Sequence, residues 1–297
     1  FMSKPNVIFL IQDQMQQQVF RPESGCIMPN FEKLAKDSVN FIRAYTCNAI
    51  CSPARASFLT GTLPHIHGMV DCTHTVPQYR AEFNDSLDTL TQAFHDGGYH
   101  VSYFGKWHIE RTHELEKFGI DTYKTEKHIP GFQVTVEDRV VLKTPGYADK
   151  MVCGIFSEGP EQTEEHYIYH EAMRDIEANA RSGQPFCTFI STYAPHDPYC
   201  VPKEIYDLYE NSDLQLAENY LDSMDDKPKV YRRMRDVLSV LSEEDFLKAK
   251  RCYYSYCTLV DQQVGKLIQY LKENDLYDNT LIVCMSDHGD MMGAHGM

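Results

Sequence analysis

The stretch Cys51-Ser52-Pro53-Ala54-Arg55-Ala56-Ser57-Phe58-Leu59-Thr60-Gly61 is the most informative part of the 297-residue chain. Pro53 stands where the first turn of a helix tolerates proline, because the N–H that proline lacks would have no intrahelical partner there. Glycine is a frequent residue just beyond the end of a helix. The stretch therefore predicts a short helix over residues 54–59 that ends at Gly61.

Around this helix, strand-sized apolar runs alternate with helix-forming stretches. The runs read as strands are residues 7–11, 39–45, 99–104, 186–193 and 280–285. Helices are predicted over residues 31–35, 87–95 and 164–180, and a long one follows Ser242, which is a good N-cap. The run at 7–11 is continuously apolar, as expected for a parallel strand buried on both faces. The alternation predicts an α/β fold: a mostly parallel sheet with helices on both faces.

Two stretches lack a clear period. Residues 109–161 carry Pro130, Gly131, Pro145 and Gly146, which predicts a long, loop-rich insertion of the kind that holds substrate contacts in α/β enzymes. Residues 200–228 are acidic near their end and are interpreted as solvated surface.

Composition excludes some functions. The chain is 42% hydrophobic and 24% charged with a net charge of −15, so sequence-independent nucleic-acid binding is not expected, because that needs a basic face. The longest apolar run, residues 7–11, is far shorter than a membrane span, so no membrane association is expected. No basic-then-apolar leader precedes it, which predicts a cytoplasmic protein, or a periplasmic one if a leader was removed.

The ten cysteines do not suggest a disulfide framework, which belongs to small secreted domains. Cys72 and seven others lack the spacing of a zinc site and are interpreted as small buried hydrophobes; the seven are Cys26, Cys153, Cys187, Cys200, Cys252, Cys257 and Cys284. A reducing compartment is expected.

Polar pairs follow the first and last predicted strands. Asp13-Gln14 comes directly after one, and Asp287-His288 after the other. Ligands of open α/β sheets collect beyond the carboxyl ends of the strands, so the two pairs could share a divalent cation there. Taken alone, an aspartate at a strand end is usually a turn or cap residue.

Two further segments place cationic side chains after predicted strands. Gly105-Lys106-Trp107-His108 follows one strand, and Pro195-His196-Asp197-Pro198 follows another. A histidine has a pKa range suited to proton transfer near neutrality, which makes His196 a candidate acid. In isolation, Gly105-Lys106-Trp107-His108 would be interpreted as a surface lysine and a structurally satisfied histidine.

Together these segments resemble the type I sulfatases, of the alkaline-phosphatase-like superfamily. The resemblance rests on four features: the Cys-x-Pro-x-Arg run ending in Leu-Thr-Gly at 51–61, Gly-Lys-Trp-His at 105–108, Pro-His-x-Pro at 195–198, and the two polar pairs. It implies a sulfatase-like catalytic α/β domain over residues 1–297. Family members continue into a further lysine and a C-terminal subdomain, so the chain is expected to be the N-terminal portion of a truncated sulfatase.

The resemblance also implies roles for individual residues. Cys51 is oxidised to Cα-formylglycine by a formylglycine-generating enzyme, and the aldehyde hydrate is the nucleophile. Arg55 braces that hydrate, and Lys106 contacts both it and the sulfate. His108 contacts a formylglycine hydroxyl, and His196 lies beside the leaving-group oxygen.

The metal pairs depart from the common family pattern. Asp13-Gln14 and Asp287-His288 look like the versions found in choline-sulfatase and phosphonate-monoester-hydrolase relatives. Oxygen ligands favour Ca²⁺, which is the expected ion, whereas the imidazole of His288 also admits Mn²⁺ or Zn²⁺.

The implied activity is hydrolysis of a small-molecule or carbohydrate sulfate ester to an alcohol and sulfate. Two alternatives stay open. One is hydrolysis of a phosphonate monoester or phosphodiester by the same nucleophile, and the other is anion binding without catalysis.

Overall fold

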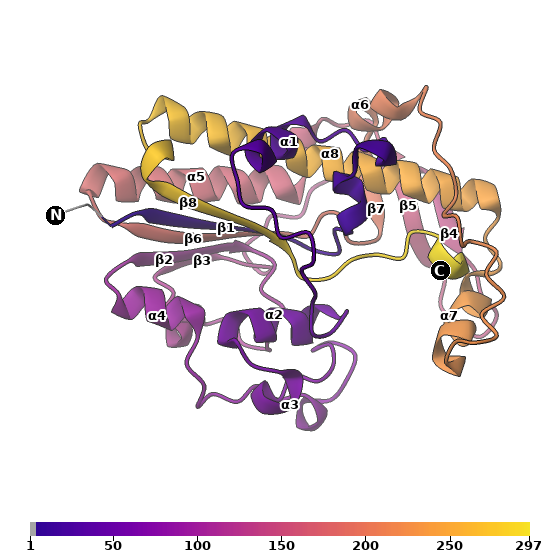
Figure 1. Ribbon diagram of the computed structural model, residues 1–297, viewed down its shortest axis with the longest axis horizontal. Helices are drawn as coiled ribbons and strands as arrows, with labels where there is room; N and C mark the ends of the chain where they lie inside the picture. The colour runs from indigo at the N-terminus through magenta and orange to yellow at the C-terminus, as the bar shows by residue number, and fades with distance from the viewer. Residues whose placement is uncertain (1–3) are drawn as a thin grey trace.

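The computed structural model describes residues 4–297 and is built around a five-stranded sheet (Figure 1). The strand order is β3-β2-β6-β1-β8, and every neighbouring pair is parallel. The strands are β1 Asn6–Gln12, β2 His100–Gly105, β3 Thr122–Lys124, β6 Phe186–Thr192 and β8 Thr280–Ser286. The predicted α/β class with a mostly parallel sheet is confirmed.

Helices cover both faces of this sheet (Figure 1). They are α1 Pro29–Lys36, α2 Cys51–Thr60, α3 Pro64–His67, α4 Leu90–Asp96, α5 Glu164–Ser182, α6 Lys203–Tyr206, α7 Lys229–Leu238 and α8 Glu243–Glu273. Gly61 ends α2 with a φ of 66°, as its position in the sequence predicts. Ser242 caps α8 in a reciprocal capping box with Asp245.

Strand β1 shows why the sheet needs both layers. All seven of its residues are buried. Ile8 and Leu10 belong to the apolar core shared with α5 and α8, whereas Phe9 and Ile11 belong to a second core that includes residues of α2. Side chains alternate between the two faces of a strand, so a continuously apolar strand has to be covered on both sides.

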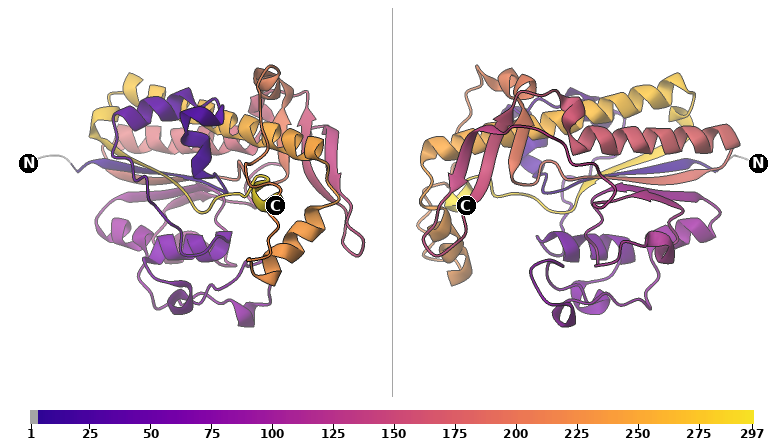
Figure 2. Two further views of the ribbon diagram at one scale, coloured as in Figure 1. Left: turned by 45° about the vertical axis from the view of Figure 1, so that its right-hand side comes forward. Right: turned by 180° about the vertical axis from the view of Figure 1, so that it is seen from behind.

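A second, three-stranded sheet lies at one end of the molecule against α8 (Figures 1 and 2). Its order is β4-β5-β7, with β4 Glu137–Leu142 antiparallel to β5 Lys150–Phe156, and β5 parallel to β7 Tyr199–Pro202. The expectation that residues 109–161 form a loop-rich insertion is therefore only partly right. Pro145 and Gly146 lie in the turn between β4 and β5, whereas Pro130 and Gly131 lie in the irregular segment between β3 and β4.

The predicted strand at residues 39–45 is wrong. This segment is irregular, and the side chains of Val39, Phe41, Ile42 and Tyr45 are each more than four-fifths exposed. Apolar and aromatic residues favour strands only where a neighbouring strand and a buried face are available. Within residues 4–297, no strand pairs with this segment.

None of the helices formed by the described residues has the length and apolar content needed to cross a bilayer.

Candidate active site

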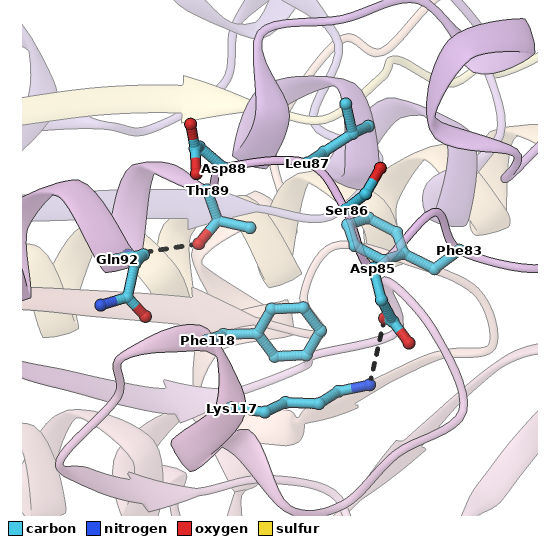
Figure 3. A pocket seen from close by; sticks show the side chains of 9 residues that line it. All are labelled: Phe83, Asp85, Ser86, Leu87, Asp88, Thr89, Gln92, Lys117 and Phe118. Carbon is cyan, nitrogen blue, oxygen red and sulfur yellow. Dashed lines mark hydrogen bonds and ion pairs between the residues drawn. The ribbon is translucent and has the colours of Figure 1, made fainter.

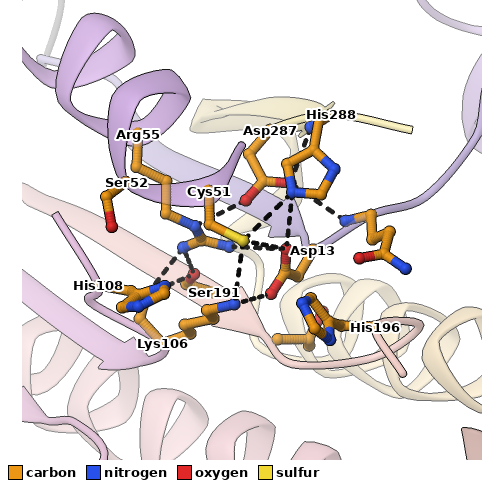
Figure 4. Close-up of polar contacts among 12 residues, drawn as sticks. Asp13, Cys51, Ser52, Arg55, Lys106, His108, Ser191, His196, Asp287 and His288 are labelled. Atoms are coloured by element: carbon orange, nitrogen blue, oxygen red, sulfur yellow. Dashed lines mark hydrogen bonds and ion pairs between the residues drawn. The ribbon is translucent and has the colours of Figure 1, made fainter. Parts of the chain in front are cut away.

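The carboxyl ends of four parallel strands meet the start of α2 at one edge of the sheet (Figure 4). Because the strands are parallel, the residues that follow them are delivered to the same place. These residues are Asp13 and Gln14 after β1, Lys106 and His108 after β2, His196 after β6, and Asp287 and His288 after β8. The structure thus gathers every residue singled out in the sequence around one position.

Cys51 occupies that position. It is the first residue of α2 and is only 6% exposed. Its Sγ lies 3.2 Å from Nε2 of His288, 3.5 Å from Nζ of Lys106 and 3.6 Å from Oδ1 of Asp13. The start of a helix carries partial positive charge, which adds to that of the neighbouring cations.

The cationic surroundings control the charge of Cys51. Burial alone would raise the pKa of its thiol, but hydrogen bonds from His108, His196 and His288 outweigh burial and, with the charge of Lys106, lower this pKa to about 3. Burial likewise opposes the charged form of His108, yet its hydrogen bonds with Cys51 and Cys72 raise its pKa to about 9. Position 51 is therefore an environment that stabilises a negative charge.

Arg55, one helical turn after Cys51, is buried and held from three sides. Its Nε donates to Oδ2 of Asp287 at 2.7 Å. Its Nη1 donates to the main-chain carbonyl of Lys106 at 2.8 Å and to Oγ of Ser191 at 2.7 Å. Arg55 thus connects α2 with the ends of β2, β6 and β8.

Gly105 lets the chain turn toward the site at the end of β2. Its φ is 99°, and a Cβ at this position would lie 1.9 Å from the main-chain oxygen of Ser191. Only glycine accepts both the backbone conformation and this close approach. The turn places Lys106 so that its ammonium contacts the carboxylate of Asp13.

Four buried side chains could hold a divalent cation. The ligand atoms of Asp13, Cys51, Asp287 and His288 all lie within 4.8 Å of one another. Nδ1 of His288 is engaged with the carbonyl of Gly289 at 2.9 Å, which leaves Nε2 facing the cluster. Two carboxylates and an imidazole suit a divalent ion, and an oxygen in place of the sulfur of residue 51 would add a hard ligand.

Gln14 lies beside this cluster. Its main-chain N–H donates to Oδ1 of Asp287 at 3.1 Å, and its side-chain amide nitrogen donates to Oδ2 of Asp290 at 2.5 Å. The amide nitrogen is also 3.5 Å from Oδ1 of Asp197. Its role as a metal ligand stays a prediction.

The two candidate acid–base histidines come from different strand ends. His196 is about one-third exposed, and its Nδ1 lies 2.6 Å from the carbonyl oxygen of Asp197. Burial would lower the pKa of His196, but hydrogen bonding to Cys51 and the nearby Asp13 carboxylate raise it. His108 follows Lys106 by two residues, and its Nε2 lies 3.6 Å from Sγ of Cys72.

Sequence reasoning missed three neighbours of the site. Ser191 orients Arg55 but lies inside a strand pattern that carries no motif. The other two are Cys72, which the sequence suggested was a buried hydrophobe, and His74. The Sγ of Cys72 lies 3.4 Å from Nδ1 of His74 and 3.6 Å from Nε2 of His108. The close Cys-x-His spacing of Cys72 and His74 was the available signal, but His108 lies 34 residues further along the chain from His74.

A pocket of about 330 Å³ lies apart from this cluster, between the start of α4 and residues 115–118 (Figure 3). Its lining includes Thr89, Gln92, Lys117 and Phe118, and Lys117 is paired with Asp85 at 3.4 Å. None of the candidate site residues lines this pocket.

Comparison with known proteins agrees with this architecture. The Sulfatase family model matches residues 5–297. The chain therefore belongs to the sulfatase family.

Among curated relatives, a choline-sulfatase of Rhizobium meliloti is 28% identical over 99% of the chain and 59% of its own length. The iduronate 2-sulfatase of Mus musculus is 29% identical over 98% of the chain and 55% of its own length. The chain thus spans less than two thirds of each.

Among solved structures, the phosphonate monoester hydrolase of Silicibacter pomeroyi superposes with a TM-score of 0.79 at 21% identity, over 99% of this chain and 64% of that one. At this identity, the likeness establishes the shared fold.

Proposed function

We propose that this protein hydrolyses a sulfate ester to an alcohol and inorganic sulfate, with residue 51 as the nucleophile after a formylglycine-generating enzyme has oxidised Cys51. The observation that carries the proposal is the surroundings of Cys51. Its side chain is buried at a helix start among Lys106, His288 and Asp13, in a site that stabilises a negative charge. Membership of the sulfatase family supports the class of reaction.

Two groups complete the chemistry. The hydrate of a formylglycine at position 51 supplies two hydroxyls on one carbon, one to attack sulfur and one to allow release of the sulfate. A divalent ion, Ca²⁺ by preference, would be held by Asp13, Asp287 and His288, with Gln14 as a further ligand, and would supply positive charge to the sulfate oxygens.

The protein's own side chains carry out the remaining steps. The ammonium of Lys106, 3.5 Å from Sγ of Cys51, holds the anionic sulfate near the nucleophile. Arg55 fixes the helix start and the Asp287 carboxylate, so the reacting groups do not have to be oriented anew in each turnover. His196 donates a proton to the leaving alkoxide, and His108 accepts one from the second hydroxyl.

The alcohol part of the substrate is a small molecule or a carbohydrate. One relative is named for choline and another for iduronate, so the likeness to relatives supports the sulfate ester without choosing between these alcohols.

Since the chain has a net charge of −15, attraction of the anionic group depends on the local cations at the strand ends.

Phosphonate monoester or phosphodiester hydrolysis is the second candidate, favoured by the Asp13-Gln14 and Asp287-His288 pairs, which look like those of phosphonate-monoester-hydrolase relatives. Initial rates on an aryl sulfate and on the matching aryl phosphonate separate the two. We expect the sulfate to have the higher kcat/KM, and the reverse order would favour the second candidate.

The same assay tests the nucleophile. Cys51→Ala is expected to bind a sulfate ester without consuming it, whereas Cys47→Ser, which changes an exposed thiol four residues earlier, keeps the wild-type rate. Wild-type turnover by Cys51→Ala would overturn the proposal. Binding without turnover by the converted wild-type protein would favour an anion-binding relative.

A further inference from the structure

Cys72, His74 and His108 form a second cluster of metal-ligand side chains beside the candidate active site. The Sγ of Cys72 lies 3.4 Å from Nδ1 of His74 and 3.6 Å from Nε2 of His108, and the two nitrogens are 3.0 Å apart. Cys72 is buried and His74 is exposed, so an ion could reach the cluster from solvent.

These separations match one face of a tetrahedral zinc site. With Zn–S of about 2.3 Å and Zn–N of about 2.0–2.1 Å, tetrahedral angles place sulfur about 3.6 Å from each nitrogen and the nitrogens about 3.3 Å apart. The observed sulfur–nitrogen distances, 3.4 and 3.6 Å, differ from this by at most a few tenths of an ångström. The nitrogen–nitrogen distance of 3.0 Å is only slightly short.

The loop that carries Cys72 and His74 is held in place. Oγ of Ser52 accepts from the N–H of Thr73 at 3.2 Å, which fastens the loop to the start of α2. Nη2 of Arg111 donates to the carbonyls of Thr73 and Val76, each at 2.9 Å. A metal would therefore find the ligands already positioned, which lowers the ordering cost of binding.

The donor set selects the kind of ion. One thiol and two imidazoles favour Zn²⁺ over Ca²⁺ or Mg²⁺, which prefer oxygen ligands. The cluster of Asp13, Asp287 and His288 is richer in carboxylate oxygens, and therefore accepts Ca²⁺ more readily than the Cys72 cluster does. The two clusters are neighbours, because His108, whose Nε2 lies 3.6 Å from Sγ of Cys72, follows Lys106, whose Nζ lies 3.5 Å from Sγ of Cys51, by two residues.

We propose that Cys72, His74 and His108 bind Zn²⁺, and that this ion reversibly inhibits the enzyme by occupying Nε2 of His108. The metal site stands on the geometry of the three side chains alone, and the inhibitory effect rests on the proposed function. A bound zinc takes the nitrogen lone pair that a base needs and fixes the ring, so His108 can no longer accept the proton assigned to it.

Cobalt substitution tests the site without any reference to turnover. A Cys51→Ser protein is titrated with Co²⁺, so that the carboxylate-rich cluster contributes no thiolate. We expect a thiolate-to-cobalt charge-transfer band, which disappears when Zn²⁺ displaces the Co²⁺. The band should remain when Cys47→Ser is added and should be absent when Cys72→Ser is added. His74→Asn, at an exposed position where unfolding is not a concern, should weaken cobalt binding at least about tenfold. The absence of a band, or its persistence in Cys72→Ser, would overturn the site.

Inhibition is then measured in the converted protein. Zn²⁺ should lower the rate of sulfate ester hydrolysis, and Cys72→Ser and His74→Asn should each resist it relative to their own zinc-free rate. Equal inhibition of wild type and both variants would overturn the regulatory part. The cobalt band is measured in Cys51→Ser and turnover in the converted wild type, so a band in the former without turnover by the latter contradicts only the proposed function. Turnover by the converted wild type together with no band in Cys51→Ser contradicts only the metal site.

Discussion

Arg55 is joined to Asp287 by a buried ion pair, with Nε 2.7 Å from Oδ2 and both side chains no more than 3% exposed. The pair connects the helix that begins at Cys51 to the end of the last strand, although the two residues are 232 positions apart. Removing one partner of a buried pair leaves the other charge uncompensated, which is more costly than the net value of the pair itself.

Arg55→Ala is therefore expected to lower the free energy of unfolding by about 3–5 kcal/mol. Urea denaturation of metal-free protein measures this, with Arg43→Ala at an exposed position as the matched control. The double variant Arg55→Ala/Asp287→Asn should lose less than the sum of the single variants, because neither charge remains. A loss below about 1 kcal/mol in Arg55→Ala would show that the pair does not hold the site together.

Gly105→Ala tests whether the turn after β2 positions Lys106. The added Cβ would meet the main-chain oxygen of Ser191 at 1.9 Å, in a backbone conformation with a φ of 99°. We expect a loss of more than about 2 kcal/mol in unfolding free energy, together with a lower kcat. Gly131→Ala is the control, since nothing lies within 4 Å of its added Cβ. A similar loss of unfolding free energy in Gly131→Ala would show that the close contact with Ser191 does not explain the effect of Gly105→Ala.

Glu165 predicts a specific pH dependence of stability. Its side chain is buried beneath the His196 segment, where it accepts a hydrogen bond from the N–H of Ala194 at 2.9 Å. Burial, aided by Glu164, raises its pKa from 4.5 to about 7. The folded state thus holds its proton more tightly than the unfolded chain, so the stabilisation is complete below pH 4.5 and is lost as the pH rises through 7.

Glu165→Gln should remove this dependence while keeping the hydrogen-bond acceptor. At about 1.4 kcal/mol for each tenfold change in acidity, wild type should lose about 2–3 kcal/mol more than the variant between pH 5 and pH 8. Urea unfolding at the two pH values measures the difference, with exposed Glu161→Gln as control. Parallel losses in wild type and Glu165→Gln would show that Glu165 does not titrate in this range.

Much of this arrangement was predictable because polar residues follow apolar strands directly. Asp13, Lys106 and Asp287 each stand within two residues of a strand end, and a parallel sheet brings such positions together. The local sequence was enough to place these side chains together, because a parallel sheet brings the residues that follow its strands to the same edge.

Features that depend on distant partners were not predictable. Residues 39–45 have the composition of a strand, yet no strand of the described chain pairs with them. Cys72 looks like a core residue until the fold brings His108 within 3.6 Å of it. In both cases, the deciding contact lies outside the local pattern.

The most direct test concerns the chemical state of residue 51. Trypsin releases residues 44–55, a peptide that contains Cys47 and Cys51. After alkylation with iodoacetamide, Cys47 serves as an internal control for thiol labelling. In protein co-expressed with a formylglycine-generating enzyme, we predict a peptide mass with one alkylated thiol, at position 47, and a hydrazide-reactive aldehyde at position 51. Two alkylated thiols in protein that hydrolyses sulfate esters at full rate would contradict the account.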